Sequence, residues 1–173
     1  KLPGAAKLFM APVKPTEELY DLESDPHEIR NLVGDKKYAK NLKKLREVHM
    51  QWVRDTGDLG LLPEAEIEIR EKRARARFNI LDGRPGLNRE LGRVAALASE
   101  GKGALPELLN AMRHSDVAVR YWGVTGVGNI GAEAKSTKSV VTKALKDSSP
   151  NVRIAAARAL VKLGDVKSAL PIL

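Results

Sequence analysis

The chain has 173 residues, a formal net charge of +8, no cysteine, and 30% charged but only 4% aromatic residues. The lack of cysteine excludes a disulfide framework, a thiolate metal site and a cysteine nucleophile. Many charges and few aromatic residues favour a mainly α protein over a β-sandwich, and the length allows one or two small domains. No apolar run approaches the roughly 20 residues that cross a bilayer, so we expect no membrane span.

The positive charge is spread unevenly along the chain. Residues 1–78 hold 16 Lys/Arg against 14 Asp/Glu, and residues 79–173 hold 14 against 8. The excess is scattered through expected helices without interleaved aromatic residues, which argues against nucleic acid as the partner. We interpret it as a solvated surface. The alternative is an anionic partner such as a sulfated glycan, a nucleic acid or a membrane surface.

The N-terminal part contains one segment that favours an extended conformation. Glu17–Leu22 predicts a short β-strand, because it combines apolar residues with a tyrosine, a strong strand former. Ser24–Pro26 predicts a turn, since its proline fixes its own φ and restricts the residue before it. A single helical turn should follow and bury Ile29 and Leu32.

The next segment predicts an amphipathic helix from about Lys36 to Asp55. Asp35 is a suitable N-cap and Gly57 a suitable C-terminal stop. We expect Trp52, at the end of the apolar stripe, to anchor a core. That stripe, at helical spacing, comprises Tyr38, Leu42, Leu45, Val48 or His49, and Trp52.

The pieces ELYDL, DPHE and NL follow one another within Glu17–Leu32, and a Gly-Asp pair and a helix with Tyr38 and Trp52 come next. This order resembles the C-terminal end of the formylglycine-dependent sulfatases (arylsulfatase-like), and the resemblance covers about Pro12 to Ile67. It implies that the strand at 17–22 pairs with a small sheet in an enzyme body outside this sequence. It also implies that the parent protein hydrolyses sulfate esters with formylglycine and a divalent metal, calcium, and is periplasmic or secreted.

The sequence itself carries none of the sulfatase chemistry. The family's Cys/Ser-x-Pro-x-Arg motif fails at Ser24–Glu28, which ends in glutamate, and at Ser148–Val152, which ends in valine. His27 and His49 have no second ligand at metal spacing, so we expect both to be structural. We therefore assign no catalytic, cofactor-binding or metal-binding residue to this segment and expect it to have no sulfatase activity alone.

A further helix is expected after Pro63, because proline is well suited to a first helical position. Acidic residues precede the basic run Arg70–Arg77, which complements the helix dipole. The alternative for that run is a site for an anion or for an acidic surface of the parent protein. We expect Phe78, Ile80 and Leu81 to pack against the helix end.

Asp82–Gly86 is a strong break. We therefore expect three parts: a sulfatase C-terminal subdomain remnant at 1–62, a connecting helix and linker at 63–86, and repeats at 87–173. We also expect the sequence to be cut at both ends, because it starts without a methionine or signal peptide and stops within a repeat unit.

Residues 87–173 repeat with an offset of 33 residues. Val119-Arg120 matches Val152-Arg153, and Ile130-Gly131 matches Leu163-Gly164. Self-similarity at this period predicts an α-solenoid built from helix pairs, with second helices at Val117–Ile130 and Val152–Leu163. The units resemble short HEAT-like repeats, truncated at the C-terminus. The expected fold class is thus mainly α, a sulfatase tail followed by a HEAT-like solenoid.

Three residues of the repeats are candidate partner contacts: Arg120, Trp122 and Arg153. We interpret the two arginines first as structural partners of Asp116 and Asp147, which would tie neighbouring units together. Trp122 aligns with an alanine of the next unit. It either fills a local gap or stands out on a face, and it is the best single candidate for partner contact.

These observations predict a non-catalytic C-terminal fragment of a sulfatase. Its partners would be the rest of the sulfatase body and, on the HEAT-like repeats, a docked protein. The alternative from another class is a free-standing helical-repeat scaffold that binds a protein. A basic module that binds nucleic acid is the weaker third hypothesis.

Overall fold

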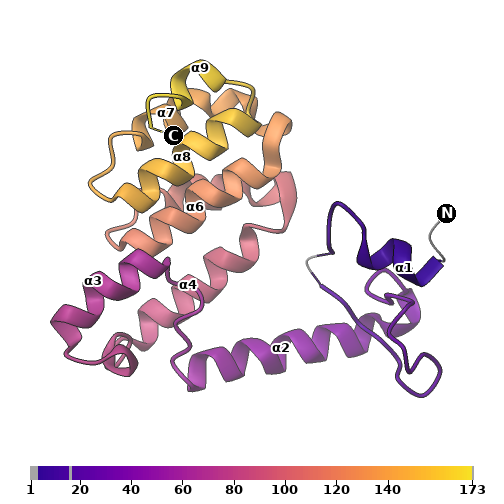
Figure 1. Ribbon diagram of the computed structural model, residues 1–173. Helices are drawn as coiled ribbons and strands as arrows, with labels where there is room; N and C mark the ends of the chain where they lie inside the picture. The colour runs from indigo at the N-terminus through magenta and orange to yellow at the C-terminus, as the bar shows by residue number, and fades with distance from the viewer. Residues whose placement is uncertain (1–3, 16, 173) are drawn as a thin grey trace. The chain divides into compact units, whose positions relative to one another are not determined.

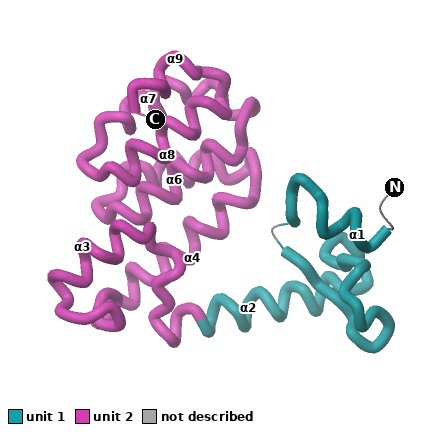
Figure 2. Tube along the Cα trace, viewed as in Figure 1, with its two compact units in different colours: residues 1–52 teal, residues 53–173 magenta. Residues whose placement is uncertain are grey.

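The computed structural model describes residues 4–15 and 17–172, and helices dominate it (Figure 1). The chain divides into two compact units, residues 1–52 and residues 53–173 (Figure 2). No β-strand occurs in the described residues. The prediction of a mainly α fold with a helical-repeat solenoid is therefore confirmed, whereas the domain limits at residues 62 and 86 stay a prediction.

The first unit contains α1 (Gly4–Phe9), the 3₁₀ helix η1 (Lys36–Tyr38) and most of α2 (Ala39–Asp55). The carboxylate of Asp35 caps η1 by accepting a hydrogen bond of 2.9 Å from the backbone N–H of Lys37. This is the predicted N-cap, and the helical segment begins and ends where the sequence indicates.

The strand predicted at 17–22 is wrong for this structure. Leu19 accepts one backbone hydrogen bond, from Leu32 N–H at 2.8 Å. The amide side chain of Asn31 accepts from Leu19 N–H (3.1 Å) and donates to Glu17 C=O (3.0 Å). A side chain thus satisfies backbone groups that a neighbouring strand would otherwise pair, and the segment stays extended without a ladder.

The first unit has little core of its own. Leu32 is its one buried apolar side chain among the described residues. Trp52 is 55% exposed and Ile29 is 47% exposed, so the predictions that they are buried are wrong. The apolar stripe of α2 does form, but three of its described residues, Leu45, Val48 and Trp52, stay more than half exposed. The exposed apolar residues of this unit are Leu8, Phe9, Met10, Val13, Leu22, Ile29, Leu45, Val48 and Trp52.

The second unit is a stack of helices in which α4, α6 and α8 lie side by side, with α5 packed on α6 and α7 on α8 (Figure 1). The helix predicted at Val117–Ile130 has those bounds, and α8 begins two residues earlier than predicted because Pro150 takes the first helical position. The elements are α3 (Glu64–Ala74), η2 (Arg77–Asn79), α4 (Pro85–Leu97), η3 (Gly101–Ala104), α5 (Leu105–Ala111), α6 (Val117–Ile130), η4 (Gly131–Thr137), α7 (Lys138–Ala144), α8 (Pro150–Lys162) and α9 (Val166–Ala169).

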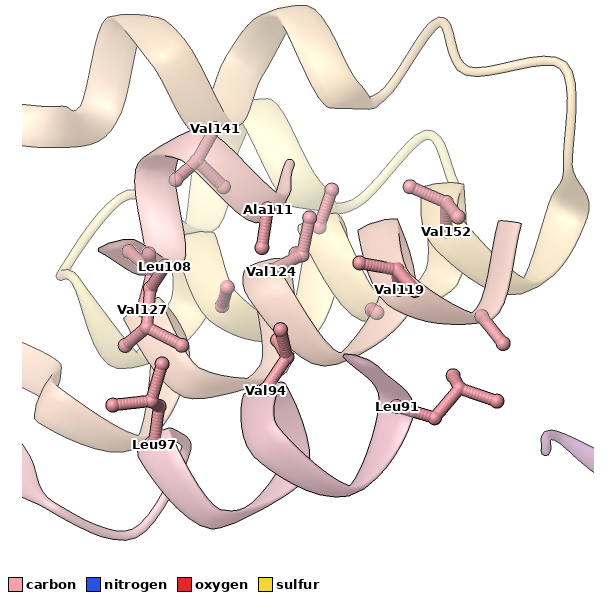
Figure 3. Close-up of a cluster of buried hydrophobic side chains, with 14 of the residues drawn as sticks. Leu91, Val94, Leu97, Leu108, Ala111, Val119, Val124, Val127, Val141 and Val152 are labelled. Atoms are coloured by element: carbon pink, nitrogen blue, oxygen red, sulfur yellow. The ribbon is translucent and has the colours of Figure 1, made fainter. Parts of the chain in front are cut away.

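A continuous apolar core runs through the second unit (Figure 3). Val119 and Val127 of α6 and Leu160 of α8 are fully buried. Gly123 explains how α6 approaches α5 so closely: a Cβ there would lie 2.8 Å from Met112 N and 2.9 Å from Leu108 O. The glycine at this helix crossing therefore has a direct steric reason.

The link from α3 to α4 is only partly as predicted. Ile80 and Leu81 are buried, but Phe78 is 79% exposed. Arg75 adopts a left-handed conformation (φ 67°) that ends α3, and in the 3₁₀ turn that follows Phe78 faces solvent. The prediction that Phe78 packs against the helix end is wrong.

Candidate functional site

Arg120 on α6 is clasped within the second unit. Its Nε and Nη2 donate to the two carboxylate oxygens of Asp147 at 2.8 and 2.9 Å. Its Nη1 donates to the backbone carbonyls of His114 (3.0 Å) and Ser115 (2.9 Å). Both charged side chains are largely buried, at 14% and 13% exposure. The predicted structural pair between neighbouring units therefore exists.

The electrostatics of Asp147 follow from this clasp. Burial by itself raises the pKa of the carboxyl, but the hydrogen bonds from Arg120 and from the backbone N–H of Ser149 outweigh burial. The pKa of Asp147 is therefore held below its usual range, and the group is ionised at neutral pH.

Arg153 occupies the same place one repeat later but, in the described part of the chain, forms only the hydrogen bonds to backbone carbonyls. Its Nη1 donates to the backbone carbonyls of Asp147 (2.9 Å) and Ser148 (3.2 Å), as that of Arg120 does one unit earlier. No carboxylate among the described residues faces its other nitrogens.

Trp122 fills a gap in the second unit. Its indole N–H donates to the backbone carbonyl of Leu61 at 2.7 Å, and its ring makes an edge contact with Tyr121 at 5.7 Å. Of the two alternatives for Trp122, the structure shows the local packing role. Direct contact of Arg120, Trp122 or Arg153 with a partner stays a prediction.

A groove of about 290 Å³ lies between the exposed faces of α6 and α8. Its floor consists of the small residues Gly128, Ala155 and Ala159. The rest of the lining is mostly polar and includes Glu64, Thr125, Asn129, Asn151, Arg158 and Lys162. The groove is therefore large enough for a side chain and offers hydrogen-bonding groups around it.

Two lining residues set the chemistry of this groove. Lys162 Nζ donates to Asn129 Oδ1 at 3.0 Å, which holds that cation against the wall. The amide nitrogen of Asn151 is buried and has no hydrogen-bond partner. A buried donor without an acceptor is costly, so the groove has an unmet demand for an acceptor.

Sequence reasoning missed this groove, although a signal was present. Tyr121, Thr125 and Asn129 recur at the 33-residue offset as Ile154, Arg158 and Lys162. Spacing of four residues places each set on one helix face. The repeat thus marks two parallel rows that together form the groove walls.

The neighbouring face of the array already holds a segment of the chain itself. Asn88 on α4 donates its amide N–H to the backbone carbonyl of Arg54 at 3.1 Å, and Trp122 does the same to Leu61. Leu62 is buried at 5% exposure, and Leu59 packs against the core. Side-chain N–H groups and an apolar floor thus hold an irregular segment on the repeats.

The described residues offer no metal site. No group of three or more His, Cys, Asp or Glu in residues 4–15 and 17–172 is arranged to hold a metal ion. His49 lies against Trp52, with ring centroids 6.4 Å apart. We therefore derive no catalytic step from these residues. Likewise, no helix in this part of the chain is long and apolar enough to cross a membrane.

Comparison with known proteins agrees with this geometry. Residues 90–173 match the family model for HEAT repeats. A second similarity is to an ulvan-active sulfatase of Formosa agariphila, which is 44% identical over 55 residues, 32% of this chain and 9% of that protein. The match thus spans under a tenth of the sulfatase. No solved structure matches the chain significantly.

Proposed function

We propose that this chain is the non-catalytic C-terminal part of a sulfatase, with a HEAT-repeat module that docks a protein. In this proposal residues 12–67 complete the small subdomain of the enzyme body, which is their partner. The repeats present an extended face outside the active site.

The exposed apolar surface of the first unit carries the proposal. A fold that leaves Leu45, Val48 and Trp52 more than half exposed on one helix face is unusual for a free-standing unit. Burial of the exposed half of such side chains against a larger body would contribute about 1 kcal/mol each, roughly half of the value for a fully exposed side chain. The match to the ulvan-active sulfatase, about as long as Pro12–Ile67, supports a sulfatase as that body.

The chemistry in this proposal belongs to the enzyme body. Formylglycine and calcium would be held there, since the described residues offer neither a nucleophile motif nor a metal cluster. The substrate class would be a sulfated polysaccharide such as ulvan, and the protein would be periplasmic or secreted.

The test starts with the natural protein that carries these residues. Its mass and peptide map should reveal a much larger chain with a formylglycine peptide, and it should release sulfate from ulvan. A natural product no longer than this chain plus a few repeats would overturn the proposal and leave a free-standing scaffold.

The role of the first unit is tested by a matched pair of variants in that full-length protein. Leu45→Asp places a charge on the apolar stripe, and Lys40→Asp places the same charge at another exposed position of α2. We expect Leu45→Asp to lower soluble yield and sulfate release several-fold, and Lys40→Asp to leave both unchanged. Equal behaviour of the two would contradict the docking of this face on the enzyme body.

A further inference from the structure

The groove between α6 and α8 is open, and one of its lining residues, Asn151, has an amide nitrogen without a hydrogen-bond acceptor. The adjoining face of α4 and α6 holds the chain's own residues through Asn88, Trp122 and Leu62. That segment leads into α3 at Pro63 and Glu64, which belong to the groove lining. The groove is therefore the continuation of a surface that already binds polypeptide.

The unmet hydrogen bond in the groove has the same chemistry as the satisfied ones beside it. Asn88 and Trp122 donate side-chain N–H groups to backbone carbonyls at 3.1 and 2.7 Å. Asn151 presents a buried amide donor that lacks an acceptor. A backbone carbonyl of a bound segment would satisfy it once the Asn151 side chain turns this nitrogen toward the groove.

The charges of the groove select the sign of the ligand. Arg158 is exposed on α8 and forms no ion pair among the described residues, and Lys162 lies one turn further along the same helix. Glu64 is the one acidic group of the lining. Arg158 and Lys162 outnumber Glu64 in the lining, and residues 79–173 have an overall excess of basic residues. Both observations favour a carboxylate-bearing ligand.

We propose that this groove binds an irregular or extended acidic segment of a partner protein. One backbone carbonyl accepts from Asn151 Nδ2, one Asp or Glu side chain pairs with Arg158, and a neighbouring apolar side chain packs on Ala155 beside the half-exposed Ile154. This inference refines the docking role within the proposed function, but its test does not depend on sulfatase activity.

The experiment uses the full-length protein and three fluorescein-labelled twelve-residue peptides. The peptides share the same Gly and Leu positions and carry Asp, Asn or Lys at the others. By fluorescence anisotropy we expect the Asp peptide to bind at least tenfold more tightly than the Asn peptide, and the Lys peptide not to bind. Arg158→Glu should weaken the Asp peptide about tenfold and give measurable binding of the Lys peptide.

Two further variants separate the groove from general charge. Asn151→Ala should weaken the Asp and Asn peptides by the same factor, because it removes a bond to the backbone and not to the side chain. Arg89→Glu changes an exposed arginine of α4 outside the groove and should change nothing.

Three results would overturn the inference. They are equal affinity for all three peptides, indifference of binding to Arg158→Glu, and tighter binding of a single-stranded DNA oligonucleotide than of the Asp peptide. The last would assign the groove to nucleic acid. Sulfate release from ulvan, measured on the same preparations, reports on the proposed function separately.

Discussion

Arg70 donates to Asp116 at 2.9 Å, the same type of pair that Arg120 makes with Asp147 one unit later. The two arginines come from different kinds of helix. Arg120 belongs to α6 within the repeats, whereas Arg70 belongs to α3, which precedes them. The residue 33 positions before Arg120 is Leu87, so α4 carries a leucine where the later units carry arginine. A helix from outside the repeat pattern therefore supplies the missing guanidinium.

Because Arg70 takes the place of the arginine that α4 lacks, α3 is part of the helical array. Arg70 is 11% exposed and also pairs with Glu66 at 2.8 Å, so two carboxylates hold it in place. Burial disfavours the charged form of Arg70, but the hydrogen bonds that it donates to both carboxylates keep its pKa raised. We conclude that α3 caps the first repeat through a charge pair that copies the contact between repeats.

Removal of one member of the clasp should destabilise the second unit. Asp147→Ala leaves Arg120 largely buried without its carboxylate and removes the acceptor for Ser149 N–H at 2.8 Å. Loss of one partner of a buried pair costs more than the pair contributes. We expect the free energy of unfolding, measured by urea titration, to fall by about 2–4 kcal/mol.

The matched control is an exposed pair on α2. Lys43 and Glu47 are 3.9 Å apart, with side chains 79% and 67% exposed. Glu47→Ala should leave the urea midpoint unchanged, because exposed pairs contribute little. If Asp147→Ala were equally silent, the clasp would have no role in stability.

The pH dependence of stability should follow the two aspartates. Burial raises the pKa of Asp116, but hydrogen bonds from Arg70 and from the N-terminal backbone of α6 outweigh it, and the net shift is downward, as for Asp147. A carboxyl whose pKa is lower in the folded state stabilises fully above its unfolded pKa of about 3.9. That stabilisation is lost as the pH falls through the folded pKa.

We therefore expect the urea midpoint to drop between pH 5 and pH 3. The double variant Asp116→Asn, Asp147→Asn should be less stable at pH 6 and should show a smaller drop over this interval. Other lowered carboxyls, such as those of Glu17 and Glu90, are shared by both proteins and cancel in the comparison. Parallel pH profiles would contradict the assignment to these two groups.

The repeat architecture could be predicted from the sequence because it depends on local periodicity. Val119 and Val152 lie 33 residues apart and are both buried, and α6 has the predicted bounds. The sequence also predicts that Arg120 and Arg153 pair with Asp116 and Asp147, and the structure shows one such pair, Arg120 with Asp147. The repeat features occur twice in the sequence, 33 residues apart, so they can be recognised from the sequence alone.

The features that could not be predicted depend on single, non-repeated contacts. Arg70 was interpreted as a dipole partner, because nothing near it in sequence indicates Asp116, 46 residues away. The prediction of a strand at 17–22 is wrong because the Asn31 side chain forms hydrogen bonds with backbone groups of this segment. The orphaned donor of Asn151 exists only through burial, which no pattern of residue types shows.

Close approach of α5 and α6 makes a sharp test of the packing. Gly123→Ala adds a Cβ that would meet backbone atoms of Met112 and Leu108 at 2.8 and 2.9 Å, and backbone atoms cannot move aside as side chains do. The gain in helix propensity is about 1 kcal/mol. Overpacking outweighs it, so we expect a net loss of about 1–3 kcal/mol in the free energy of unfolding.

Gly86 provides the comparison for that variant. It lies in the first turn of α4, and a Cβ there meets nothing within 4 Å. Gly86→Ala should therefore leave stability unchanged or raise it slightly, because the restricted unfolded chain is the main effect. A stabilising Gly123→Ala would show that the two helices are further apart than described.

Residues 56–63, which lie on the repeats, should be held less firmly when the indole N–H of Trp122 is removed. Trp122→Phe keeps most of the ring volume but deletes the N–H that donates to Leu61 C=O at 2.7 Å. The carbonyl is then left without this partner, which should cost about 1–2 kcal/mol of stability. Because that bond holds the segment between α2 and α3, we expect faster cleavage by a protease within residues 56–63.

Asn88→Ala, which removes the donor to Arg54 C=O, should act in the same direction, and the double variant should be cleaved faster than either. Unchanged cleavage in all three would mean that the leucines alone hold the segment on the repeats.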